Sequence, residues 1–80
     1  MPHVTLRILK EFATPEVKAK FIARISEAVV DVIVEDSDAD REKVLAHTTC
    51  IVETVPCESW GLGGVPLTPE SVKELLGISE

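Results

Sequence analysis

The sequence predicts an α/β (α+β) fold in which one βαβ unit with parallel strands precedes a hairpin and a short helix. Three observations support this prediction: an alternating apolar pattern at residues 4–9, a long helical pattern from residue 15, and a β-branched segment at residues 48–55. The order strand, helix, strand implies a right-handed crossover between two parallel strands. At 80 residues, the chain has room for a single domain, residues 1–80.

Alternation and capping residues define the first strand and the first helix. Apolar side chains alternate with other side chains from Val4 to Leu9, the period-2 pattern of a half-buried strand. Thr14 then suits the N-cap position, Pro15 the first helical position, and Glu16 the positive end of the helix dipole. We therefore expect a strand close to the amino terminus and a helix that begins at residue 15.

The expected long helix carries a wide apolar surface. A polar stripe at helical spacing consists of Lys20, Arg24, Glu27 and Asp31. A parallel apolar stripe, which we expect to face the core, consists of Phe21, Ile25, Ala28 and Val32. Further apolar residues widen this surface: Val17, Ile22, Val29, Val30, Ile33 and Val34. Two interpretations follow, a well-covered core helix or a helix that is buried on two sides, partly by another subunit.

An acidic break separates this helix from the second strand. Ser37 or Asp38 could cap a short helix over Arg41–Ala46. The β-branched segment Thr48–Val55 then predicts a strand, which Pro56 ends. Two parallel strands alone are not stable in water, so we expect the chain to self-associate.

The last part of the chain predicts a turn and a capped helix. The glycine-rich segment Trp60–Gly64 predicts a turn or hairpin. Thr68 and Pro69 repeat the start signals of the first helix, and Gly77 suits the position just past a helix end. We expect a short amphipathic helix between them.

Composition limits the partners and the location of the protein. With 8 Lys+Arg against 14 Asp+Glu, the formal net charge of −6 argues against nucleic acid and anionic membrane partners. Hydrophobic residues make up 45% of a chain that buries only about 60% of its surface alone, which favours self-association. No secretory signal or membrane-spanning stretch is recognised, so we expect a soluble cytoplasmic protein.

The cysteines and histidines do not predict a metal or disulfide site. Cys50 and Cys57 would lie about 20 Å apart along an extended strand, beyond disulfide reach unless the chain reverses at Pro56. Their spacing with His47 is not that of a zinc site, and no Cys-x-x-Cys occurs. We expect free thiols, no metal and no cofactor.

Four stretches of the chain together resemble a known family. They are Pro2–Leu9, Arg24–Val29, Val52–Pro56 and the aromatic-Gly-x-Gly-Gly turn Trp60–Gly64. In this order and at this length they are similar to the 4-oxalocrotonate tautomerase family, over roughly residues 2–64. The resemblance implies a single tautomerase-like domain, cofactor-independent isomerase chemistry, and assembly into dimer-based hexamers or heterohexamers. The region of Arg41–Ala46 and the carboxyl-terminal helix are longer than the family pattern.

The resemblance makes Pro2 the candidate catalytic residue. Removal of Met1 would leave Pro2 with a free secondary amine, and burial or a nearby cation lowers the pKa of such a group from its usual value of about 8. A base with a pKa near the working pH is suited to proton transfer. In the family the corresponding proline acts as general base for keto–enol proton transfer. The alternative role for Pro2 is a proline that merely starts a strand.

The resemblance also implies substrate-binding residues. Trp60 aligns with the aromatic residue that closes the family's pocket at a subunit interface, and Leu9 and Leu62 match apolar wall positions. Trp60 could instead simply pack the hairpin.

Two arginines of the family pattern are absent. Phe12 and Ala13 stand where the first arginine is expected, and the position expected for the second arginine falls near Thr49. We expect Lys10 or Arg7 to bind the substrate in their place, and His47 is a further candidate; a lysine lacks the bidentate fork of an arginine.

The leading functional prediction is a keto–enol tautomerase that acts on a small unsaturated or 2-keto acid. One alternative is a non-catalytic or hetero-oligomeric subunit with a tautomerase fold, for which the missing arginines argue. Another alternative keeps Pro2 but changes the reaction to hydration or dehalogenation.

Overall fold

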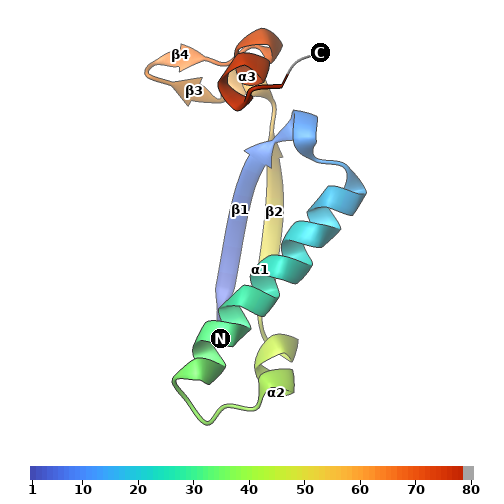
Figure 1. The fold of residues 1–80 in the computed structure, drawn as a ribbon, viewed down its shortest axis with the longest axis vertical. Coiled ribbons are helices and arrows are strands. Elements are labelled where there is room, and N and C mark those ends of the chain that lie inside the picture. The colour runs from blue at the N-terminus through green and yellow to red at the C-terminus, as the bar shows by residue number, and fades with distance from the viewer. Residues whose placement is uncertain (79–80) are drawn as a thin grey trace.

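The computed structural model describes residues 1–78 and confirms the predicted βαβ unit (Figure 1). Strands β1 (His3–Leu9) and β2 (Thr49–Val55) are parallel, with His3 opposite Thr49 and Leu9 opposite Val55. The connection between them contains helix α1 (Pro15–Glu35) and the short helix α2 (Arg41–Ala46). The other elements are the 3-10 turns η1 (Lys10–Phe12) and η2 (Cys57–Ser59), strands β3 (Gly61–Leu62) and β4 (Val65–Pro66), and helix α3 (Pro69–Leu76).

The two faces of the parallel pair differ as the alternation predicts. Along β1, Val4, Leu6 and Ile8 are half-buried, and α1 crosses this side of the sheet (Figure 1). On the other side His3, Thr5 and Arg7 are exposed, and Arg7 pairs there with Glu53 of β2, at 2.8 Å between Nε and Oε1. The uncovered face of the sheet is therefore largely polar.

Helix α1 begins as predicted, but a different stripe faces inward. Thr14 is the N-cap, and its hydroxyl accepts a hydrogen bond from the Val17 N–H at 3.2 Å. The buried residues of α1 are Ser26 and Val30. Of the predicted core stripe, Ile25 is half-buried, whereas Ala28 is exposed, Phe21 is 37% exposed and Val32 is 62% exposed. The prediction that this stripe faces the chain's own core is wrong, because the second apolar set supplies most of the inward face.

The N-cap of α1 gives a stability prediction. Thr14→Ala removes the acceptor of the Val17 N–H and is expected to lower the free energy of unfolding by about 1 kcal/mol. Thr14→Ser keeps a hydroxyl and should lose only a small part of this amount. Denaturant unfolding of the three proteins at equal concentration measures the difference, and equal stability of the alanine and threonine forms would contradict the role of the cap.

Helix α2 has the predicted bounds but a different cap. The N-cap is Asp40, not Ser37 or Asp38, and its Oδ1 accepts from the N–H groups of Glu42 and Lys43. The Ser37 hydroxyl instead donates to the Ile33 carbonyl at 2.7 Å, in the last turn of α1. An ion pair between Arg41 and Asp31 joins the start of α2 to α1.

The carboxyl-terminal part confirms the predicted hairpin and capped helix. Strands β3 and β4 are antiparallel and joined by Gly63 and Gly64, whose φ angles of 62° and 84° suit a two-residue hairpin turn. Thr68 and Ser71 form a capping box at the start of α3. Gly77 lies just past its end with a φ of 70°.

One chain buries little of its apolar surface by itself. The buried hydrophobic residues are Val30, Cys57 and Val72. The radius of gyration is 16.3 Å, against about 12 Å for a compact domain of this length, and the extents are 48 × 26 × 18 Å. Within residues 1–78, no helix is long and apolar enough to cross a membrane. The elongated shape and exposed apolar side chains leave a large area for other molecules to cover.

Candidate active site

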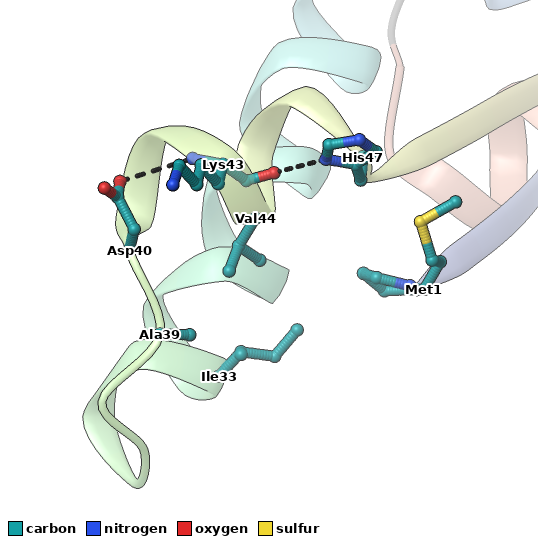
Figure 2. Close-up of a pocket in the computed structure, with 8 residues that line it drawn as sticks. Met1, Ile33, Ala39, Asp40, Lys43, Val44 and His47 are labelled. Carbon is teal, nitrogen blue, oxygen red and sulfur yellow. Dashed lines mark hydrogen bonds between the residues drawn. The ribbon is translucent and has the colours of Figure 1, made fainter.

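A cavity of about 500 Å³ opens at the amino end of β1, where Pro2 lies. Its lining comes from three places: the amino terminus, the end of α1, and the segment that leads into and through α2 (Figure 2). The lining residues are Met1, Pro2, Ile33, Ala39, Asp40, Lys43, Val44 and His47. The cavity is therefore an apolar hollow with a few polar groups, the general form of a small-molecule site.

Pro2 is half-buried and held in place by the start of β2. Its carbonyl accepts from the Thr49 N–H at 3.1 Å and from the Thr49 hydroxyl at 3.4 Å. The His3 ring extends this network, since its Nδ1 lies 2.7 Å from the Thr49 hydroxyl and its Nε2 lies 2.9 Å from the Thr5 hydroxyl. Thr49, near which the resemblance placed an arginine, thus anchors Pro2 at the cavity.

Two nitrogen-bearing side chains line the same cavity: Lys43 in α2 and His47 at the carboxyl-terminal cap of α2. Lys43 and His47 are exposed and four residues apart, so they lie on one side of the helix. His47 Nδ1 lies 2.8 Å from the Lys43 carbonyl (Figure 2). Because a carbonyl only accepts, Nδ1 is the protonated ring nitrogen, and Nε2 remains free of this bond.

Arg7 and Trp60 lie together, but away from Pro2. They line a cavity of about 340 Å³ with Val55, Ser59 and Gly61. The Arg7 side chain is 69% exposed and bonded to Glu53. Trp60 is half-buried and precedes β3, so this cavity lies toward the carboxyl end of the parallel strands.

The remaining predicted site residues also lie toward this end. Leu9 ends β1, Lys10 begins η1, and Leu62 lies in β3, where it lines a hollow with Leu75. Six residue steps along β1 separate His3 from Leu9, which is about 20 Å. In Figure 1 the amino terminus lies at the lower end of the parallel strands, and the hairpin with α3 lies beyond their upper end. A single chain therefore does not bring Pro2 together with Leu9, Lys10, Trp60 or Leu62.

The cysteines do not form a reactive site. Cys50 and Cys57 are both free thiols, and Cys57 is buried. Burial raises the pKa of the Cys57 thiol, and the carboxylates of Glu11 and Glu58 raise it further, so the thiolate is disfavoured. In the described part of the chain, no group of three or more His, Cys, Asp or Glu side chains could hold a metal ion.

Most of the lining of the Pro2 cavity is not recognisable from the sequence pattern. Lys43, Asp40, Val44 and Ile33 belong to no site motif, and the pattern of α2 predicts only a short connecting helix. The parallel register contains the missing signal. Because His3 pairs with Thr49, the residues just before β2 must lie beside the residues just before β1. The end of α2 therefore meets Pro2.

Comparisons with known proteins agree with this architecture. The family model described as tautomerase enzyme matches residues 2–69. The probable tautomerase K2 of Dickeya dadantii (strain 3937) is 32% identical over 68 residues, which cover 85% of this chain and 90% of that protein. The crystal structure of apo unFused 4-OT matches with a TM-score of 0.61 and 25% identity, over 81% of this chain and 97% of that chain. DmpI from Helicobacter pylori matches in fold, with a TM-score of 0.51 and 22% identity over 81% of this chain and 94% of that chain.

Proposed function

Because the chain belongs to the tautomerase family, we propose that it is an isomerase that uses Pro2, after removal of Met1, as general base for keto–enol proton transfer. The observation that carries this proposal is the position of Pro2. It is half-buried, its carbonyl is fixed by Thr49, and it lines a mostly apolar cavity of about 500 Å³. An apolar environment disfavours the ammonium form of an amine and so favours the neutral form, which can accept a proton.

The proposed reaction needs no oxidant or reductant. The Pro2 nitrogen takes the proton of an enol hydroxyl, which breaks the O–H bond and forms an N–H bond. The oxygen electron pair then forms the ketone, and the electrons of the C=C bond take the proton back from nitrogen at carbon. Atoms and electrons balance within the substrate, a small unsaturated or 2-keto acid. Positive groups close to the developing enolate oxygen would stabilise the transition state.

The proposed active site is shared between copies of the chain. Pro2 lies about 20 Å from the end of the sheet that carries Leu9, Lys10 and Trp60, so these residues can meet a Pro2 only in a neighbouring copy. The many exposed apolar side chains support such an assembly. We propose a dimer-based hexamer in which Trp60 and Leu62 of one copy cover the Pro2 cavity of another. Arg7 and Lys10 would add positive charge from the same neighbour.

The test is ketonisation of phenylenolpyruvate by the processed protein and by Pro2→Ala. The alanine form keeps a primary amine but changes its basicity and position, and we expect kcat/KM to fall by about 100-fold or more. Intact mass must first show that Met1 is absent from both proteins. Equal rates for the two proteins would contradict Pro2 as the base. A rate no higher than the uncatalysed one for both would favour the non-catalytic subunit instead.

A further inference from the structure

The Pro2 cavity contains its own positive group, on the helix that precedes β2. Lys43 and His47 line the cavity from α2 and its carboxyl-terminal cap, together with the apolar residues Ile33 and Val44. The sequence makes His47 a candidate substitute for the absent arginines at residues 12–13 and 49, whereas Lys43 is recognised only from the fold.

One oxygen of the acidic residue of the cavity is engaged at the start of α2. Asp40 Oδ1 accepts from the Glu42 N–H at 2.9 Å and from the Lys43 N–H at 3.4 Å, as the N-cap of α2. Among residues 1–78, the ion pairs are Arg7 with Glu53 and Arg41 with Asp31, and Lys43 belongs to neither. The Lys43 ammonium therefore has no ion-pair partner among the described residues, and its four-carbon stem lets it move across the mouth of the cavity.

The His47 ring is oriented by the backbone of the same helix. Its Nδ1–H donates to the Lys43 carbonyl at 2.8 Å, which fixes the ring and leaves Nε2 as the atom open to a ligand. Over the part of the chain that the structure describes, Nε2 has no hydrogen-bond partner. In the imidazolium form, Nε2 would donate to an anion beside Lys43.

The geometry points to Lys43 as the residue that binds the substrate carboxylate beside Pro2, with His47 Nε2 as the second polar contact. This inference rests on the proposed function, and it names the substrate class as a 2-keto acid whose carboxylate lies toward α2 while its enol lies at Pro2. An ammonium ion at a mostly apolar cavity attracts a carboxylate more strongly than it would in open water. The net charge of −6 makes a local cation necessary for binding an anion.

The first test uses cinnamate, an unreactive unsaturated acid, and cinnamamide, its uncharged counterpart, as calorimetric probes of the processed assembly. Lys43→Gln is expected to weaken cinnamate binding about tenfold and to leave cinnamamide binding unchanged. Lys43→Arg should keep cinnamate binding within about threefold of the original. Lys73→Gln, which makes the same charge change on α3, is the matched control and should bind both probes like the unaltered protein.

Two substitutions separate the ring nitrogens of His47. His47→Asn places an amide near the position of Nδ1 and keeps the bond to the Lys43 carbonyl, but it removes the group at Nε2. His47→Gln places an amide near Nε2 and loses the backbone bond. If Nε2 contacts the carboxylate, the asparagine form should bind cinnamate several-fold more weakly than the glutamine form. The reverse order of affinities would overturn the role of His47 Nε2.

Kinetics separate this inference from the proposed function. With phenylenolpyruvate, Lys43→Gln should raise KM about tenfold with little change in kcat, and it should not raise KM for the methyl ester. Equal effects on acid and ester, unchanged cinnamate binding in Lys43→Gln, or no cinnamate binding at all would overturn the inference. Cinnamate binding that depends on Lys43, in a protein without ketonisation activity, would instead contradict the proposed function alone.

Discussion

Insertion of one lysine between Met1 and Pro2 is expected to reduce ketonisation to the uncatalysed rate. A large second residue prevents removal of Met1, so the Pro2 nitrogen becomes part of a peptide bond. The lone pair of an amide nitrogen is delocalised into the carbonyl, and it cannot accept a proton near neutral pH. The loss should therefore exceed that of Pro2→Ala, which keeps an amine.

The insertion should leave the fold intact. The added residue precedes β1, which begins at His3, and the bonds from Thr49 to the Pro2 carbonyl do not involve the Pro2 nitrogen. Intact mass, circular dichroism and sedimentation of the inserted protein provide the controls, and initial rates provide the measurement. A correctly assembled, unprocessed protein with full activity would rule out Pro2 as the base.

Val32→Glu is expected to prevent assembly and, with it, stable folding. Val32 is 62% exposed on α1, so a glutamate there costs an isolated chain little. In an assembly that covers this surface, the same glutamate would be a buried and unpaired charge, which costs about 3 kcal/mol or more. Sedimentation and thermal unfolding at several concentrations measure the effect, and the Tm of the unaltered protein should rise with concentration.

Lys20→Glu supplies the matched control for this substitution. It introduces the same side chain at an exposed position of α1, within the polar stripe that also contains Arg24 and Glu27. This protein should assemble and unfold like the original. An assembled Val32→Glu protein, or an original protein that stays folded as a monomer at high dilution, would show that one chain is stable by itself.

The elements of the fold were predictable because local chemistry specifies them. The alternation along β1, the Thr14-Pro15 start of α1 and the αL glycine after α3 each depend on neighbours within a few residues. The inward face of α1 was not predictable in the same way. Two apolar sets share this helix, and hydrophobicity alone cannot say which set packs on the chain's own sheet and which remains exposed, as Val32 does.

The candidate site was only partly predictable for a related reason. Pro2 could be chosen from its position next to Met1, whereas Lys43 and His47 come near it through the pairing of β1 with β2. The proximity of residues that are more than 40 positions apart can be predicted only when that register is known. The choice of Asp40 rather than Ser37 or Asp38 as cap likewise depends on how the loop turns back toward α1, where Arg41 pairs with Asp31.

The distance between Pro2 and Trp60 along the sheet has a genetic consequence. Under the proposed arrangement, the two ends of one polypeptide serve two different catalytic centres. A copy with a defective Pro2 amine still contributes an intact Trp60 to the site of its neighbour, and a copy without Trp60 still contributes an intact Pro2 amine. Defects at the two ends would therefore complement each other in mixed particles, and duplicated genes could divide the two roles between them.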